Sequence, residues 1–374
     1  MLTRVVVAGG GTGGHVFTGV AVLDELRRRA PDAAITYLGS SLGQEARLVP
    51  ASGYLHAPLD VRAIRLGGPL DGARALAKLP AAVVAAAELL VAARAQVVLG
   101  VGGAVAGPAL VAASLLGLPA VLHEQNTIPG LANRWLRPFV KHVMLGFGEA
   151  GPHFPRHTTT TTGNPVRRSV ARLLAGPGRP VKAAGDGVFE VLVLGGSDGS
   201  DFLNAQVPAA LIRAAAQTGA RLRVHHQAGH DDLAAIRARY WEGLGAEVVV
   251  EEFIDDIGAA YARADLAVAR GGALSLAELA LAGVPTLIVP LAGAADDHQT
   301  QNARVYRAAG AALVQSERRW ATADAGDLLA RMIADAGLRE GLSRRIRALA
   351  RPDAAARVVD GLERRARDAG TLTR

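Results

Sequence analysis

The sequence contains no cysteine among its 374 residues, and aromatic side chains make up only 4% of it. The absence of cysteine excludes disulfide bonds and thiolate metal sites, and it fits a reducing compartment. Few aromatic rings are present to stack on bases, and no nucleic-acid recognition motif occurs, so we predict no nucleic-acid partner. Half of the residues are apolar, which is enough for a packed core.

Long uninterrupted apolar runs are also scarce, and residues 97–122 are the segment that requires a test. This segment carries no charge, and a membrane-spanning helix needs ~20 apolar residues. Glycines and prolines interrupt it, however. We therefore predict a strand at 96–101, a helix at 108–117 and a strand at 119–122 in place of a span.

The acidic residues are fewer than the basic ones, 34 against 41, which gives a formal net charge of +7. A basic surface attracts anionic lipid or phosphorylated substrates. A contribution to solubility alone would also explain this net charge, so the charge does not identify a binding partner.

Short apolar strands, glycine-rich loops and helical stretches alternate along the chain, and this pattern starts again in the second half. The predicted strands of the second half are FEVLVLGG, RLRVHHQAG, AEVVVEEF, LAVARGG and TLIVPLA. Such alternation is typical of parallel sheets covered by helices on both faces. We predict an α/β protein with two Rossmann-like, doubly wound parallel-sheet domains.

The boundaries follow from the same pattern. We expect an N-terminal domain at 1–164 and a C-terminal domain at 165–352, with a basic amphipathic helix at 353–374 that packs back on the first domain. The threonine run 158–162 is predicted as the last strand of the first domain, because β-branched residues favour strands. Residues 176–187, rich in glycine and proline, are predicted as a surface loop.

The stretch AGGGTGGHVFTG, residues 8–19, follows the first predicted strand and opens a helix. Glycines at a helix start let an anion approach backbone N–H groups at the positive end of the helix dipole. The spacing Gly9-x-Gly11-x-x-Gly14 also fits a dinucleotide fingerprint, which requires an acidic residue at the end of the second strand. That strand ends in Leu38-Gly39-Ser40-Ser41, with Glu45 only later, so an NAD-dependent oxidoreductase is a weaker alternative.

His15 lies where this loop becomes a helix. One interpretation is a capping or buried histidine. The other is a general base, because the helix dipole disfavours the protonated ring and leaves a neutral imidazole that can accept a proton.

Seven short motifs occur in order along nearly the whole chain: GGGTGGHVF, HEQN (123–126), GNPVR (163–167), LGGSDG (194–199), EFIDDI (252–257), GALSLAEL (272–279) and DHQTQNA (297–303). With these motifs the chain resembles the MurG family of bacterial peptidoglycan glycosyltransferases. The resemblance implies the GT-B architecture, in which two Rossmann-like domains face a cleft and the second domain holds UDP-N-acetylglucosamine. It also implies inverting, metal-independent transfer of N-acetylglucosamine to undecaprenyl-diphospho-muramoyl-pentapeptide, which turns lipid I into lipid II in cell-wall synthesis.

The resemblance further implies where the protein works and what it binds. The partners would be UDP-N-acetylglucosamine, lipid I and an anionic membrane surface, to which the protein binds peripherally on the cytoplasmic face. No cofactor and no metal are expected. The chain has no Asp-x-Asp, the motif of metal-using transferases of the other common fold, and its adjacent pairs Asp255-Asp256 and Asp296-Asp297 point apart in extended chain.

Site residues carry over from the family motifs as follows. His15 would be the base, Thr12, Gly13 and Gly14 would approach the acceptor diphosphate or the sugar, and Asn126 would contact the donor sugar. In the second domain, Glu278 would hold the ribose hydroxyls and Gln299 the sugar hydroxyls. The remaining implied contacts are Arg167 and Ser197 to diphosphate or sugar, Ile254 to uracil through its backbone, and the backbone of Ala273, Leu274 and Ser275 to the diphosphate. Leu276 and Ala277 are implied as further substrate-binding residues.

Several of these residues have a purely structural alternative. Ser275-x-x-Glu278 fits a capping box, Gln299 fits a helix start, and Arg167 fits an ordinary surface arginine. The apolar stretch 74–94, with basic ends, is either a membrane-surface helix or a core helix. The pair His153 and His157 has metal-ligand spacing with Pro155 inside it, and we interpret it as surface.

Three residues depart from the family pattern: Thr18 stands where proline is usual, Asp198 where glutamine is usual, and Gly271 where serine is common. A carboxylate at Asp198 would repel a diphosphate, or it caps the following helix. These departures leave open a catalytically silent nucleotide-sugar-binding protein. Another GT-B enzyme, such as a glycolipid glycosyltransferase or a UDP-N-acetylglucosamine 2-epimerase, is the nearest rival.

Overall fold

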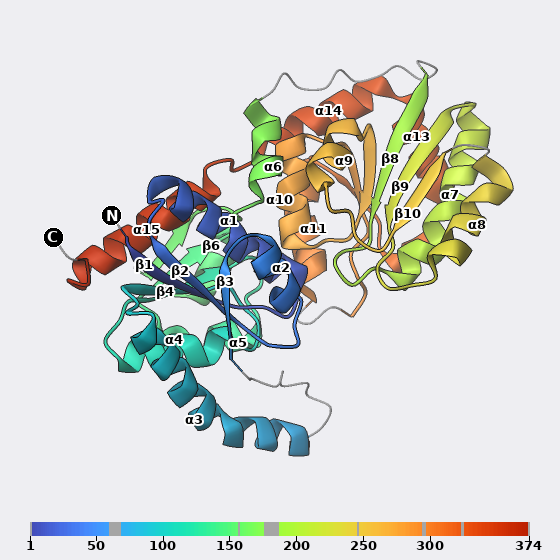
Figure 1. The fold of residues 1–374 in the computed structure, drawn as a ribbon. Helices are drawn as coiled ribbons and strands as arrows, with labels where there is room; N and C mark the ends of the chain where they lie inside the picture. The colour runs from blue at the N-terminus through green and yellow to red at the C-terminus, as the bar shows by residue number, and fades with distance from the viewer. Residues whose placement is uncertain are drawn as a thin grey trace. The chain divides into compact units, whose positions relative to one another are not determined.

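The computed structural model describes residues 2–59, 69–155, 158–175, 187–244, 247–293, 297–322 and 325–372. The chain divides into two compact units (Figure 1). Unit 1 comprises Met1–Arg167 and Asp353–Arg374, and unit 2 comprises Arg168–Pro352. The predicted join after Asn164 lies just before this division.

Unit 1 is built on a parallel sheet, seven-stranded within the described residues, with the order β3-β2-β1-β4-β5-β6-β7. Its strands are β1 (Arg4–Ala8), β2 (Ala34–Gly39), β3 (Leu55–Pro58), β4 (Val97–Gly100), β5 (Ala120–Glu124), β6 (His142–Leu145) and β7 (Thr159–Thr161). Its helices are α1 (Gly13–Arg29), α2 (Glu45–Ala51), α3 (Pro69–Ala92), α4 (Ala106–Leu115), α5 (Leu131–Trp135) and α15 (Ala354–Asp368).

Helices cover both faces of this sheet because successive strand residues point to opposite sides. Val5 and Val7 of β1 pack with α1 and α15, whereas Val6 and Ala8 pack with α3 and α4 (Figure 1). Leu362 of α15 is fully buried in the first of these clusters. The C-terminal helix is therefore part of the core of unit 1.

Unit 2 repeats the arrangement with a parallel sheet that has six strands in the described part of the chain, in the order β10-β9-β8-β11-β12-β13. Its strands are β8 (Val188–Leu194), β9 (Arg221–Gln227), β10 (Val248–Glu251), β11 (Leu266–Ala269), β12 (Thr286–Ile288) and β13 (Leu313–Val314). Its helices are α6 (Arg168–Ala171), α7 (Asp201–Thr218), α8 (Leu233–Leu244), α9 (Ile257–Arg263), α10 (Ala273–Ala282), α11 (His298–Ala308), α12 (Glu317–Thr322), α13 (Ala325–Ala334) and α14 (Ala336–Ala348).

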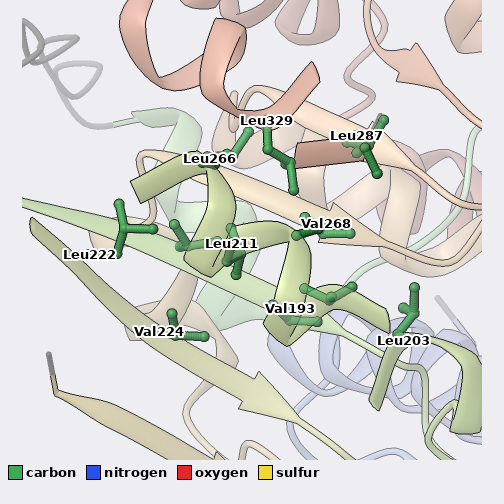
Figure 2. Packing of buried hydrophobic residues seen from close by; sticks show 14 of the residues in the cluster. Val193, Leu203, Leu211, Leu222, Val224, Leu266, Val268, Leu287 and Leu329 are labelled. Carbon is green, nitrogen blue, oxygen red and sulfur yellow. The ribbon is translucent and has the colours of Figure 1, made fainter. Parts of the chain in front are cut away.

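One aliphatic cluster holds α7 and α13 against the unit 2 sheet. Val193 of β8 and Val268 of β11 meet Leu203 and Leu211 of α7 and Leu329 of α13 in this cluster (Figure 2). All five side chains have 0% exposure. Burial of such a side chain contributes about 1.5–3 kcal/mol, so the cluster fixes where α7 begins relative to the end of β8.

In both sheets the strand order reverses once, between β1 and β4 in unit 1 and between β8 and β11 in unit 2. Ligands of doubly wound sheets bind outside the carboxyl ends of the strands at this reversal point. The loops that follow β1, β4, β8 and β11 are therefore the places where binding residues are expected.

The predicted fold class is confirmed, including the strand in the threonine run, which is β7. Residues 97–122 form β4, α4 and the start of β5, with α4 beginning two residues earlier than predicted. In the described part of the chain, no helix combines the length and the apolarity that crossing a membrane requires. The predicted surface loop 176–187 lies outside the described residues except for Gly187.

Candidate functional site

The glycine-rich loop after β1 packs directly on the loop after β4. The N–H of Gly10 donates to the carbonyl of Gly102 at 3.2 Å. A Cβ placed on Gly103, whose φ is +83°, would lie 2.2 Å from the carbonyl oxygen of Gly10. Only glycine permits this approach, and it brings both loops of the unit 1 reversal point into contact.

His15 is in the first turn of α1 and is anchored by this loop. Its Nδ1 lies 3.0 Å from the carbonyl oxygen of Gly10 and 3.3 Å from Oγ1 of Thr12. Because a carbonyl only accepts hydrogen bonds, Nδ1 must carry the proton, and Nε2 of the neutral ring is then the basic nitrogen. A Cβ on Gly102 would lie 2.7 Å from this Nε2, so the β4 loop forms one wall beside the basic atom.

Glu45 is a site residue whose role the sequence did not predict. Its side chain is 1% exposed, and it accepts the N–H of Gly11 at 3.0 Å and the N–H of Ser40 at 2.8 Å. The carboxylate therefore holds the glycine loop against the end of β2. In a dinucleotide site the acidic residue near β2 binds ribose, whereas the Glu45 carboxylate is turned toward the backbone of the loops after β1 and β2.

The HEQN motif at the end of β5 is mostly buried. His123 and Gln125 are 0% and 4% exposed, and their Nε2 atoms donate to the carbonyls of Gly163 at 3.1 Å and Val101 at 2.9 Å. Burial lowers the pKa of His123 to about 4, so this ring is neutral and braces the backbone. Gln125 and Asn126 follow the last residue of β5, and Asn126 is the member of the motif that is partly exposed.

Arg167 packs on α1. Its guanidinium carbon lies 4.3 Å from the ring centroid of Phe17, two residues after His15 in the helix. This cation–π contact places the charge beside α1, where Arg167 is partly exposed.

In unit 2, the loop after β8 leads into α7 through Ser200. The Ser200 hydroxyl accepts the N–H of Leu203 at 3.2 Å and is the N-cap of α7. The prediction that Asp198 caps this helix is therefore wrong. Asp198 is exposed in the loop, next to the partly exposed Ser197, because the chain makes a further turn at Gly199 before the helix begins.

Gln227, at the end of β9, links two predicted contact segments. Its Nε2 donates to the carbonyl of Gly196 at 2.6 Å, and its Oε1 accepts the N–H of Ile254 at 3.5 Å. The side chain of Ile254 is 2% exposed, so only its backbone can face a ligand. The sequence did not single out Gln227, because a lone glutamine after a strand has no motif.

Helix α10 begins at Ala273, with Gly272 as an N-cap that provides no side-chain hydrogen bond. Ser275 is thus inside the first turn, and the capping-box interpretation of Ser275-x-x-Glu278 is wrong. Glu278 is 2% exposed, and its Oε2 accepts the hydroxyl proton of Tyr261 of α9 at 3.1 Å. Leu274 and Leu276 are buried, whereas Ser275 and Ala277 are partly exposed on the same helix.

Gln299 is in the first turn of α11, and it is more than a helix-start residue. Its Oε1 accepts the N–H of Gly271 at 3.0 Å and that of Leu291 at 3.1 Å. A Cβ on Gly271 would lie 2.5 Å from the backbone oxygen of Gln299, which explains why glycine stands there. Asn302, one turn later, donates to the carbonyl of Gly271 at 3.1 Å. Helix α11 thus fixes the loop that precedes α10.

Within the described residues, no group of three or more His, Cys, Asp or Glu side chains is arranged to hold a metal ion. His153 is partly exposed in a short helical turn at Gly148–His153, and His157 lies outside the described residues.

Residues 5–145 match the glycosyltransferase family 28 N-terminal domain, and residues 190–336 match the C-terminal domain of the same family. The chain belongs to glycosyltransferase family 28 and, within it, to the MurG-type N-acetylglucosamine transferases.

The relatives cover almost the whole chain. The UDP-N-acetylglucosamine–N-acetylmuramyl-(pentapeptide) pyrophosphoryl-undecaprenol N-acetylglucosamine transferase of Halorhodospira halophila is 43% identical over 95% of this chain and 96% of its own length. The protein of the same name from Nitratidesulfovibrio vulgaris is 39% identical over 96% and 97%. Among solved structures, Acinetobacter baumannii MurG is 30% identical with a TM-score of 0.73, over 96% of this chain and 99% of that one.

We predict that Glu45→Gln destabilises unit 1. The glutamine NH₂ must face either the Gly11 or the Ser40 N–H, and loss of a buried, charge-assisted hydrogen bond costs about 1.5–3 kcal/mol. Chemical denaturation followed by circular dichroism measures the effect.

The matched control is Glu25→Gln, which removes a carboxylate paired with Arg28 and Arg29 near the surface of α1. Surface pairs contribute about 0–1 kcal/mol, so the control is expected to change stability little. Equal losses in the two variants would contradict the role assigned to Glu45.

Proposed function

We propose that this protein transfers N-acetylglucosamine from UDP-N-acetylglucosamine to the 4-hydroxyl of the muramoyl sugar in undecaprenyl-diphospho-muramoyl-pentapeptide, with inversion, to form lipid II. The observation that carries the proposal is identity of about 40% to transferases of that name over nearly the full length of both chains. The loops at the two strand-order reversal points supply suitable chemistry for the reaction.

The departing diphosphate needs positive charge, and α10 supplies it. The first-turn N–H groups of Ala273, Leu274 and Ser275 lie at the positive end of a helix whose N-cap, Gly272, has no side-chain cap. Fixed N–H donors stabilise developing negative charge without reorganisation. Ser197, in the loop after β8, and Arg167, whose guanidinium packs against Phe17 of α1, are proposed as further contacts of the diphosphate or the sugar. No metal is assigned a role.

The acceptor hydroxyl needs a base, and His15 is our candidate. The Gly10 carbonyl fixes the tautomer in which Nε2 accepts the proton. The neighbouring backbone of Thr12, Gly13 and Gly14 at the start of α1 is proposed to approach the acceptor diphosphate or the sugar. Helix α1, like α10, begins without a side-chain cap hydrogen bond.

Most of the proposed donor contacts come from unit 2. Glu278, oriented by the Tyr261 hydroxyl, is proposed to accept hydrogen bonds from the ribose hydroxyls. The Ile254 backbone is proposed to face uracil, and Gln299 and Asn126 to contact the sugar. The backbone of Leu276 and Ala277 continues the α10 segment along the donor.

The lipid acceptor requires a membrane surface, which we propose unit 1 binds peripherally on the cytoplasmic face. Exposed apolar side chains occur on contiguous elements, at Val84 and Val91 of α3, Leu115 and Leu116 at the end of α4, and Leu131 and Trp135 of α5. The adjoining segment 134–141 carries Arg134, Arg137 and Lys141 and no acidic residue. Helix α3 also buries Ala86 and Leu90 in the core, as the core-helix interpretation predicts. Its exposed Val84 and Val91 are the side chains that we propose contact the membrane.

The function test is transfer of labelled N-acetylglucosamine to a lipid I analogue, with analysis of the product. The wild-type protein is expected to form the β-1,4-linked disaccharide, and His15→Ala to lower kcat about 100-fold or more, the usual contribution of a general base. His153→Ala is the control. Wild-type kcat in His15→Ala contradicts the base assignment, and epimerised UDP-sugar in place of disaccharide contradicts the function.

Tyr261→Phe is expected to raise the donor KM about ten-fold with little change in kcat, because Glu278 loses a hydrogen bond of about 1–1.5 kcal/mol that orients it toward the ribose. Glu278→Ala is expected to raise it further. Tyr54→Phe removes a similar hydroxyl–carboxylate bond, to Asp24 in unit 1, and is the matched control. Equal effects of the two Tyr→Phe variants on donor KM would refute the ribose role.

Trp135→Ser is expected to weaken binding to anionic phosphatidylglycerol vesicles about ten-fold, because a large apolar side chain is no longer buried in the interface. Co-sedimentation measures this, and neutral phosphatidylcholine vesicles should bind less than anionic ones. Leu291→Ser, at an exposed position in unit 2, is the control. Unchanged binding of Trp135→Ser would show that another surface makes the contact.

A further inference from the structure

The carboxylate of Glu124 lies under the loop that connects β5 to α5. The side chain is 1% exposed and is surrounded by amide donors. Its Oε1 accepts the backbone N–H of Asn126 at 2.9 Å and the side-chain Nδ2 of Asn126 at 3.3 Å. Its Oε2 accepts Nδ2 of Asn133, in α5, at 2.6 Å, and the backbone N–H of Gly130 donates to it as well.

This carboxylate therefore ties the two ends of the loop 125–130 together. Asn126 is at the beginning of the loop, and Gly130 and Asn133 are at its end and in the helix that follows. Burial raises the pKa of Glu124, while the four donors oppose that rise.

The contact also determines which way the Asn126 amide points. Four N–H donors converge on the Glu124 carboxylate, so its oxygens act as acceptors and the amide nitrogen of Asn126 faces it. The amide is planar, and Oδ1 is therefore directed away from Glu124. Asn126 is partly exposed, whereas Glu124 and Asn133 are buried.

We propose that Glu124 is a positioning residue: it fixes the Asn126 amide with Nδ2 inward, so that Oδ1 is presented as a hydrogen-bond acceptor to an N–H or O–H group of the donor sugar. This rests on the proposed function, in which Asn126 contacts that sugar. Glu124 itself touches no substrate. Asn133 supports it by holding the second carboxylate oxygen.

The test is a double-mutant cycle of Glu124→Gln and Asn126→Ala. Both oxygens of Glu124 accept N–H donors, so the NH₂ group of Glu124→Gln faces an N–H donor in either orientation. The Asn126 amide then loses its fixed orientation. We expect kcat/KM for UDP-N-acetylglucosamine to fall about ten-fold or more, as for loss of a hydrogen bond to a charged group. In the Asn126→Ala background the same change should cost almost nothing, because the residue through which it acts is gone.

A second readout separates positioning from a purely structural role. Calorimetric affinity for UDP alone should be the same in the wild-type protein and in Glu124→Gln, whereas the additional affinity for UDP-N-acetylglucosamine over UDP should fall. Glu25→Gln, in the same unit, is the matched control and should change neither. Asn133→Ala, alone and with Asn126→Ala, provides a second cycle if Glu124→Gln does not fold, with a smaller effect in the same direction.

The proposal is overturned if Glu124→Gln costs the same with and without Asn126, or if affinity for UDP falls in parallel with that for the sugar nucleotide. It is also overturned if the wild-type protein binds UDP-N-acetylglucosamine no better than UDP. Failure of the proposed function gives a different result. A protein that shows this calorimetric pattern but does not transfer sugar to a lipid I analogue supports the positioning role of Glu124 and contradicts the proposed acceptor.

Discussion

The constraint on which the site depends is that parallel strands bring all their carboxyl ends to one edge of a sheet. In each unit the strand order reverses once, so the loops from two neighbouring strands diverge at that edge and leave room between them. Helices α1 and α10 begin at these edges without side-chain caps. Their first-turn N–H groups are the natural partners of a phosphate, and the chemistry proposed here follows from that geometry.

Buried polar side chains hold these loops from behind, and this is a second common feature of the two units. Glu45 holds the glycine loop of unit 1. In unit 2, Gln227 holds the loop after β8 and the Ile254 backbone, and Gln299 holds the loop before α10. The oxygen or nitrogen of each side chain forms hydrogen bonds with backbone groups that have no partner within a helix or strand. Loops that must approach a ligand closely cannot be packed by large apolar side chains, so hydrogen bonds to buried side chains fix their shape instead.

Much of this could be predicted from the sequence, because the signals are local. Alternating apolar strands and glycine-rich loops predict two doubly wound sheets, and β-branched preference predicts the strand in the threonine run. The two predictions that the structure contradicts both concern the residue at which a helix begins. Asp198 and Ser275 have the residue types of caps, but Ser200 and Gly272 occupy the cap positions. The turn at Gly199 delays the start of α7, whereas α10 begins directly after the extended residue Gly272. Glu45, Gln227 and Tyr261 were missed because their partners are distant in sequence and no motif marks them.

The central claim is that backbone amides and helix dipoles, without a cation, carry the charge of the sugar diphosphate. Calorimetric titration of UDP-N-acetylglucosamine in buffer with EDTA, compared with the same titration in Mg²⁺, tests it most directly. The account predicts the same affinity in both buffers, and a preference for UDP-N-acetylglucosamine over UDP-glucose that the chelator does not change. Loss of binding in EDTA that Mg²⁺ restores would contradict it.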